Sequence, residues 1–349
     1  MRTALLDYDL PDDLIARRPP AERDGGRMLV VRRGGLEHRR VREWVELVPP
    51  GALVVLNDTR VLPARLLGRR AGGGGRVELL LLERLGAAGE RERWRAIGHA
   101  NRPLRPGAEI DAGELRVTVG SRGAGGSLEI ELVAAGGVGA ALERSGHVPL
   151  PPYLGRPDEP DDRVRYQTVY AAAAGSAAAP TAGLHLTEAA LERLVARGVE
   201  IARVTLHVGL GTFRPVTVEE LSEHVMHAER FEIGAEAAEA IRRARARGGP
   251  VVAAGTTVVR ALESAADPAG GGVVLPGPGE TRLLVQPGHR FAVIDALLTN
   301  LHQPRSTLLA LVAAFGGLDA VRAAYREAVA ARYRFLSYGD AMWFPERGS

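Results

Sequence analysis

The stretch TEAALERLVARGVEIARVTLHVGLG, from Thr187 to Gly211, decides the fold class. Its first half places apolar residues at helical spacing, Gly198 ends that pattern, and an apolar run suited to a buried strand follows. The same order recurs at residues 238–266, where a helix pattern, a Gly-Gly pair, a short strand and a Gly-Thr-Thr turn lead into another helix. Helices that alternate with strands predict an α/β main domain with a layered, mixed sheet.

Residues 67–152 have a different texture, because short strand-like runs are separated there by glycine-rich turns. Runs such as RVTV and LEIEL alternate polar and apolar residues, as half-buried strands do. This pattern predicts a small all-β barrel at 67–152, inserted into an α/β catalytic domain formed by residues 1–66 and 153–349. The proline- and charge-rich stretch PLPPYLGRPDEPDDR would be the linker that leads back into the main domain.

Composition excludes several kinds of chemistry. The 349-residue sequence contains no cysteine, which excludes disulfides, thiolate zinc sites and a cysteine nucleophile. It also contains no lysine, so all 45 basic Lys+Arg positions are arginine, which excludes a Walker A loop and a lysine Schiff base. A net charge of +3 permits an RNA partner without requiring one.

The sequence patterns do not favour a membrane span or a secretory signal. Its apolar runs fall short of the roughly 18–20 residues that span a bilayer, and its first residues turn acidic too soon for a secretory signal. We therefore expect a cytoplasmic protein with no membrane partner, and we expect a monomer.

Three glycine- and threonine-containing loops follow apparent strands or precede helices, where ligands of α/β folds tend to bind. In the first, His207 stands before Gly209 and Gly211, whose lack of a side chain would let the backbone approach a ligand. A Gly-x-Gly pair is a weak signal, however, and a lone histidine at a strand end is often a satisfied core residue. Both interpretations stay open for this loop.

The second loop, APTAGLHLTEAAL, contains Thr181, Gly183 and His185 in front of the helix that begins after Thr187. A neutral histidine there could accept a proton, whereas Thr187 is explained by helix capping. The third loop, AGTTVVRALES, offers the free N–H groups of a helix start to an anion, although capping alone would also explain its threonines. Its polar residues are Thr256, Thr257 and Arg260.

Further polar residues end apparently buried strands, where a carboxylate needs partners and often acts as a base. These clusters are Asn57-Asp58-Thr59-Arg60, Asp295 with Thr299-Asn300, and Ser337-Tyr338-Gly339-Asp340. The sequence HVMHAERFEI places His224 and His227 three residues apart, a spacing compatible with a metal on a helix. We expect no metal, because no third ligand stands in register with them.

These same loops resemble those of the S-adenosylmethionine:tRNA ribosyltransferase-isomerase family of queuosine biosynthesis. The resemblance extends over nearly the whole chain. It rests on DYDLP, NDTRVLPARL, GHVPLPPY, DRVRYQTVYA, APTAGLHLT, TLHVGLGTFRPV, HAERFEI, GTTVVRALES, DALLTNLHQPRSTLLALVAAFGG and YRFLSYGDAM. Departures from the family pattern are small, namely Leu186, Val258 and Gln303, and they concern details of the pocket.

The resemblance implies that S-adenosylmethionine (AdoMet) donates its ribosyl unit to a 7-aminomethyl-7-deazaguanine base in tRNA. The product would be epoxyqueuosine-tRNA, with adenine and methionine released. AdoMet would be a consumed co-substrate, and no tightly bound cofactor is expected. A base would remove a proton beside the sulfonium, and an acid would protonate the departing adenine.

The resemblance also suggests roles for residues. The candidates for base and acid are His185, His207, Asp58 and Asp340. AdoMet would be bound by Thr181, Gly183, Gly209, Gly211, Thr212, Phe213, Thr256, Thr257, Arg260, Arg305 and Tyr338, with Arg260 or Arg305 on the methionine carboxylate and Phe213 or Tyr338 on the sulfonium. The candidates for gripping tRNA are Arg163, Arg165, Arg69 and Arg70.

Two other classes of function remain as alternatives. A non-catalytic RNA-binding protein would need a basic surface but not the His, Asp and Thr residues at the strand ends. An AdoMet-dependent RNA methyltransferase would be expected to carry a strand–GxGxG–helix unit near its N-terminus, and the sequence has none.

Overall fold

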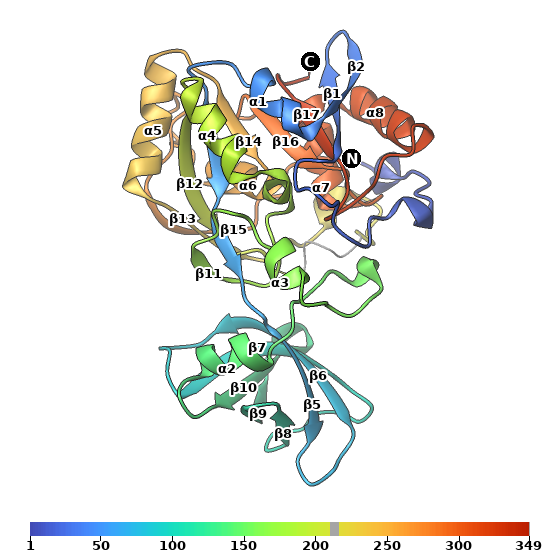
Figure 1. Ribbon diagram of the computed structural model, residues 1–349, viewed down its shortest axis with the longest axis vertical. Helices are drawn as coiled ribbons and strands as arrows, with labels where there is room; N and C mark the ends of the chain where they lie inside the picture. Colours follow the sequence, from blue (N-terminus) through green and yellow to red (C-terminus); the bar gives the residue numbers. More distant parts are fainter. Residues whose placement is uncertain (210–215, 349) are drawn as a thin grey trace.

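The computed structural model describes residues 1–209 and 216–348. Within these ranges, nine strands form a mixed sheet in the order β15-β13-β12-β3-β14-β16-β17-β1-β2 (Figure 1). In chain order the strands are β1 (Arg27–Arg32), β2 (Gly35–Arg40), β3 (Leu53–Asn57), β12 (Glu200–Leu206), β13 (Glu229–Ile233), β14 (Val251–Ala254), β15 (Gly277–Thr281), β16 (Ala296–Asn300) and β17 (Ala341–Phe344). The central strands β12, β3, β14 and β16 are parallel, which confirms the predicted α/β sheet.

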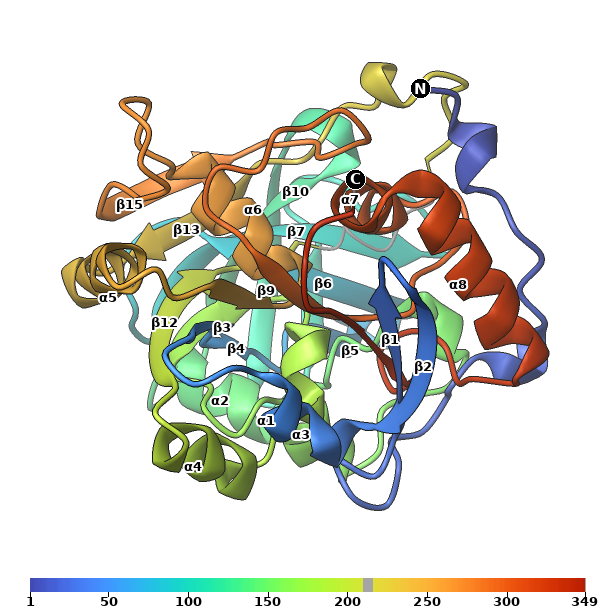
Figure 2. The same ribbon diagram turned by 90° about the horizontal axis from the view of Figure 1, so that it is seen from above.

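Helices cover both faces of this sheet, because its central strands are apolar on both sides. Along β3, Leu53 and Val55 belong to one core cluster, whereas Val54 and Leu56 belong to another. Figure 2 shows α1 (Trp44–Leu47) and α4 (Glu188–Ala196) on one side of the sheet. The other side carries α5 (Ala235–Ala246), α6 (Thr256–Ser264), α7 (Thr307–Gly316) and α8 (Leu318–Ala330).

The stretch that decides the fold class forms the predicted elements. Thr187 caps α4, because its side-chain oxygen accepts a hydrogen bond from the Ala190 N–H at 3.1 Å. Gly198 ends the helix region with a φ of 79°, a conformation that favours glycine. The chain then enters β12 directly, so that the helix and the strand pack together as the pattern predicted.

The glycine-rich region forms a closed barrel in the order β10-β7-β6-β5-β8-β9, at the lower end of Figure 1. Its strands are β5 (Arg65–Arg70), β6 (Arg76–Arg84), β7 (Arg91–Ala100), β8 (Glu109–Ala112), β9 (Leu115–Arg122) and β10 (Leu128–Val133), and α2 (Val138–Ser145) follows them. The barrel has its own apolar core, to which alternate residues such as Val117 and Val119 contribute. The barrel insertion is thus confirmed. Its first strand, β5, already begins at Arg65, and we propose that the domain ends near residue 152.

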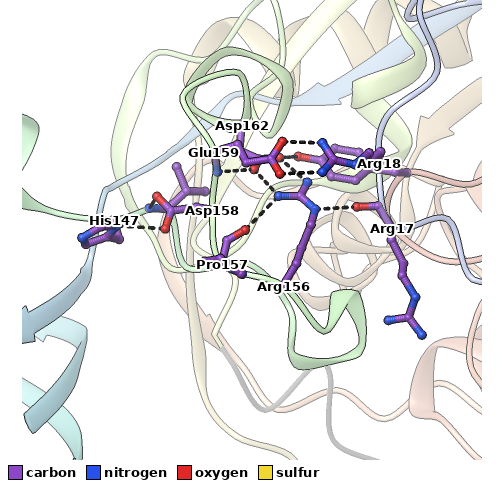
Figure 3. A network of polar contacts seen from close by, with 10 residues as sticks. Arg17, Arg18, His147, Arg156, Pro157, Asp158, Glu159 and Asp162 are labelled. Atoms are coloured by element: carbon purple, nitrogen blue, oxygen red, sulfur yellow. Dashed lines mark hydrogen bonds and ion pairs between the residues drawn. The ribbon is translucent and has the colours of Figure 1, made fainter. Parts of the chain in front are cut away.

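The return connection from the barrel is held firmly by polar contacts, although its composition suggested only a linker. It includes α3 (Asp162–Arg165), and nearby β4 (Thr59–Val61) and β11 (Ala173–Ser176) pair as a small sheet. Figure 3 shows Asp162 at the centre of a network in which Arg156 contacts both carboxylate oxygens, at 2.6 and 2.8 Å. The Glu159 N–H and the Tyr338 hydroxyl also donate to Asp162.

One local expectation was wrong. Before β16, which begins at Ala296, the backbone N–H groups of residues 292–294 donate to the Glu263 carboxylate. His224 and His227 are not on a helix, since a short 3-10 turn ends at Glu223 and irregular backbone leads from there to β13.

Among the described residues, no single helix has the length and apolarity to cross a membrane. Only the sharply bent pair of α7 and α8 meets that test when the two helices are taken together.

Candidate functional site

Three adjoining cavities lie where loops follow the central strands. Two of them share Thr181, Asn300, His302 and Leu308, and we call them the neutral cavities. The third also contacts Leu308, and we call it the charged cavity. Its described lining includes His224, His227, Glu229 and Arg260.

The turn after β14 brings α6 to the neutral cavities. Gly255 has a φ of 110°, a conformation that side chains rarely adopt, and it lets the chain pass directly from the strand into the helix. Thr256 and Thr257, the first residues of α6, line one neutral cavity. Asn57 at the end of β3 fixes this arrangement, because its Nδ2 donates to Leu206 O at 3.0 Å and to Thr257 Oγ1 at 3.1 Å.

His302 is the histidine that the structure places in both neutral cavities, and it was not among the sequence candidates. Its Nε2 lies 2.8 Å from Thr299 Oγ1. Its backbone is held by two tyrosines, since Tyr325 Oη accepts its N–H and the Tyr8 hydroxyl donates to its carbonyl. Burial lowers the pKa of His302 to about 3, so that the imidazole is neutral at physiological pH.

His185 lies behind the neutral cavities and is not among the described residues that line them. It is buried, and its Nε2 lies 3.2 Å from the Nδ2 of Asn300. Burial lowers the pKa of His185 to about 4. The Asn300 Nδ2 also donates to Leu336 O, which orients the amide so that an N–H faces His185, and His185 therefore positions Asn300 instead of facing a ligand.

His207 and Asp58 form a separate cluster that does not line the three cavities in the described ranges. The His207 Nδ1 lies 2.8 Å from Thr59 Oγ1, and Thr205 donates to Asp58 at 2.7 Å. Burial lowers the pKa of His207, although the Asp58 carboxylate acts in the opposite direction. The next residue, Val208, lines a neutral cavity, and alternate residues of an extended chain point to opposite sides.

Asp340 and Tyr338 serve the framework, and the structure does not bring them to the cavities in the described ranges. The two carboxylate oxygens of Asp340 accept the N–H groups of Arg27 at 2.8 Å and Arg334 at 2.7 Å. The Tyr338 hydroxyl donates a hydrogen bond to Asp162 Oδ1 at 2.7 Å. The structure therefore divides the strand-end polar residues between the cavities, the His207–Asp58 cluster and the framework around Asp340.

Arg260 provides the positive charge of the charged cavity. It forms a buried ion pair with Glu229, and its Nε donates to Leu283 O at 3.1 Å. Its Nη2 is buried without a hydrogen-bond partner. Burial lowers the pKa of Arg260 only to about 10, so the guanidinium stays charged. Glu229 also accepts the Gly209 N–H at 2.9 Å, which brings the strand β12 loop to this cavity.

The other AdoMet-binding candidates divide into three groups. Thr181 lines both neutral cavities. Arg305 lies outside the described lining of all three cavities, with its Nη1 3.9 Å from Asp7 Oδ2. Gly211, Thr212 and Phe213 lie outside the described residues.

Comparison with known proteins identifies the family. A sequence model described as queuosine biosynthesis protein matches residues 3–344. The chain belongs to the queuosine biosynthesis protein family. This confirms the resemblance seen in the motifs.

Relatives in the queuosine biosynthesis family match the chain from end to end. A protein of Sorangium cellulosum named S-adenosylmethionine:tRNA ribosyltransferase-isomerase is 56% identical, over 98% of this chain and 98% of the relative. A protein of the same name from Anaeromyxobacter sp. is 54% identical with the same coverage. The crystal structure of an S-adenosylmethionine tRNA ribosyltransferase from Thermotoga maritima is similar with a TM-score of 0.55 and 34% identity, covering 97% of this chain and 99% of that one.

The histidine pair of this family member lines the charged cavity, but it does not form a recognisable metal site. Burial and the neighbouring His227 lower the pKa of His224. Among the described residues, no group of three His, Asp or Glu side chains is arranged to hold a metal ion.

Gly183 is explained by packing instead of ligand contact. A Cβ at this position would lie 2.1 Å from the hydroxyl of the buried Tyr170. We expect Gly183→Ala to lower the free energy of unfolding by about 1–3 kcal/mol, because the core must shift to accept the methyl group. Gly209→Ala is the matched control, since the nearest described atom to its Cβ would be 3.8 Å away. Urea denaturation of both variants measures the difference, and equal stabilities would contradict this role.

The four arginines proposed for tRNA differ in how far they are already engaged. Arg163 donates to the Glu143 carbonyl at 2.8 Å and so ties α3 to the helix after the barrel. Arg165 and Arg70 also donate to backbone carbonyls, those of Ala21 and Pro20 and those of Arg102 and Pro103. Arg69 is exposed on β5 of the barrel.

Proposed function

We propose that the chain transfers and isomerises the ribosyl moiety of AdoMet onto the 7-aminomethyl-7-deazaguanine base of tRNA. Epoxyqueuosine-tRNA is the product, and adenine and methionine are released. The names of the full-length relatives support this reaction. The observation that carries it is the junction of a charged cavity with two neutral ones, because AdoMet joins a charged amino acid to a neutral nucleoside.

The charged cavity binds the methionine end of AdoMet in this proposal. The buried Arg260 Nη2 lacks a partner, and a carboxylate is the acceptor that a guanidinium prefers. The Glu229 carboxylate in the same cavity attracts the α-ammonium group. The loop threonines, Thr256 and Thr257, line the neighbouring neutral cavity and fit the nucleoside better than the carboxylate first proposed for them.

His302 is the base that we propose for removing the proton beside the sulfonium. Among the described residues lining the neutral cavities it is the one imidazole, and its Nε2 lies 2.8 Å from Thr299 Oγ1. The sulfonium charge acidifies the neighbouring C–H, and a positioned neutral imidazole can accept that proton. His185 supports this site through Asn300, and the His207–Asp58 cluster lies beside it.

The barrel surface is proposed to grip the tRNA backbone. Arg69 on β5 lies directly opposite Arg76 on β6, and both are exposed. Like charges opposite each other on a sheet destabilise it, and a phosphate between them removes that repulsion. On its other side Arg69 lies opposite Asp111 of β8, which in turn lies opposite Arg116. The exposed Arg69–Arg76 pair supports Arg69 as the tRNA contact among the four arginines first proposed.

Replacing both Arg69 and Arg76 by glutamine should weaken tRNA binding and reduce its salt dependence. The slope of log K against log salt should fall in magnitude by about one to two, because one or two phosphate contacts are lost. Titration of tRNA at several salt concentrations measures it. Arg39→Gln on β2, at the opposite end of the molecule from the barrel, is the control (Figure 1). If the slope of log K against log salt is unchanged in the double variant, Arg69 and Arg76 do not contact tRNA phosphates.

Mass spectrometry tests the proposed reaction. The protein is incubated with AdoMet and tRNA carrying the aminomethyl base, and we expect free adenine and a ribosyl-sized mass gain on the tRNA. A methyl-sized gain would support the methyltransferase alternative, and tRNA binding without either product would support the RNA-binding alternative. We further propose that the protein works as a monomer in the cytoplasm, which sedimentation and fractionation can test.

A further inference from the structure

We propose that Asn300 selects the adenine ring of AdoMet by accepting a hydrogen bond from its exocyclic amino group. This inference rests on the proposed function and deepens it. Asn300 ends β16 and lines both neutral cavities. It is only 2% exposed, so an unmatched polar atom on it has a real energetic cost.

The orientation of the Asn300 amide is fixed by its neighbours. One partner of Nδ2 is the carbonyl oxygen of Leu336 at 3.1 Å, which can only accept a hydrogen bond. The other is the Nε2 of His185 at 3.2 Å, which accepts from this N–H in the tautomer that carries its proton on Nδ1. Both N–H bonds of the amide are therefore used, and the NH₂ group cannot exchange places with the oxygen.

The Asn300 Oδ1 is left as a buried acceptor without a partner. Buried polar atoms in proteins are almost always satisfied, so an orphan acceptor on a residue that lines a cavity points to a ligand that donates. The same wall contains hydroxyl groups of Thr181, Thr299 and Ser337, which can donate or accept as the ligand requires. Oδ1 differs from them because it can only accept.

Charge decides which part of AdoMet supplies the donor. The described residues lining the neutral cavities include no Asp, Glu or Arg, so the α-ammonium group is better placed in the charged cavity beside Glu229. The ribose hydroxyls can pair with threonine and serine hydroxyls. The exocyclic amine of adenine is a neutral group that donates, and it matches an atom that only accepts.

The test compares AdoMet with an analogue that carries hydrogen in place of the exocyclic amino group. Calorimetry gives the Kd of each ligand for the wild-type protein, and adenine or purine release gives kcat/KM. We expect the wild type to prefer AdoMet by about 10- to 100-fold, because the analogue leaves Oδ1 unpaired. Asn300→Leu removes the acceptor, and its preference should fall close to one.

Asn300→Asp is the second variant, because it keeps an acceptor in place and should retain the preference if the first variant fails to fold. Circular dichroism and thermal unfolding check the fold of both. A wild type that binds the two ligands equally would overturn the role of Asn300 while leaving the proposed reaction standing. If the Asn300 variants change only the KM for tRNA, the acceptor recognises the tRNA base. That result would also overturn the proposed role of Asn300 in adenine recognition. A wild type that neither binds AdoMet nor releases adenine would instead refute the proposed function.

Discussion

Replacement of His302 by glutamine is expected to lower kcat for adenine release by about 10²- to 10⁴-fold, the usual contribution of a positioned general base. Glutamine keeps a polar group that can bond to Thr299, so the loss should reflect the missing proton acceptor instead of a collapsed cavity. AdoMet binding should weaken much less than turnover. Single-turnover measurements of adenine release, together with calorimetric AdoMet binding, separate the two effects.

The control for this experiment is His99→Gln, the same substitution at an exposed position on β7 of the barrel. It should retain turnover, because His99 lies on a different domain from the cavities. Full activity in His302→Gln would remove His302 as the base. A loss of AdoMet affinity as large as the loss of kcat/KM would assign it to binding alone.

Asp162→Asn is expected to lower the free energy of unfolding by about 3–5 kcal/mol, because it leaves the Arg156 guanidinium without its ionic partner. The Arg156 side chain is only 13% exposed, so water cannot replace the carboxylate. The network joins the return connection to the Tyr338 segment before β17. Urea denaturation at neutral pH measures the effect. Asp161→Asn, at the exposed neighbouring position, should change stability by less than about 0.5 kcal/mol.

The effect of Asp162 should depend on pH in a defined direction. Burial alone would raise the pKa of this carboxyl, but hydrogen bonds from Arg156, the Glu159 N–H and Tyr338 outweigh burial and hold it below its ordinary value. A lowered pKa in the folded state contributes stability above the unfolded pKa of about 3.9, and that contribution is lost as the pH falls through the folded pKa. The stability difference between wild type and variant should therefore shrink below about pH 4. A difference that is constant with pH would show that packing, and not charge, is responsible.

The sequence could predict the elements whose residues repeat at a regular spacing. The helix and strand at residues 187–206 and the alternating strands of the barrel were visible because burial on one face leaves a periodic trace. The glycine at 255 and the threonines after it also marked a strand-to-helix turn that reaches a cavity. These signals are local, so a single sequence contains them.

The roles of strand-end polar residues could not be predicted in the same way. A buried carboxylate at position 340 needed partners, but the partners are backbone N–H groups of Arg27 and Arg334, and no side-chain pattern reveals them. His302 was not predicted because it does not lie in a glycine-rich loop, and glycine-rich loops were the signal used to select histidine candidates. Its backbone is held by hydrogen bonds with Tyr8 and Tyr325, and the sequence around His302 shows neither partner. Which polar residues share a cavity therefore depends on long-range packing.

The sheet order determines which parts of the chain can fold during translation. The first strand to be synthesised, β1, pairs only with its hairpin neighbour β2 and with β17, the last strand. The barrel, by contrast, is made of strands that follow one another closely and can close while translation continues. The amino-terminal hairpin must wait, with one edge unpaired, until nearly the whole polypeptide has emerged. Such an edge invites pairing with other chains, so a stalled nascent product should be the most aggregation-prone form of this enzyme.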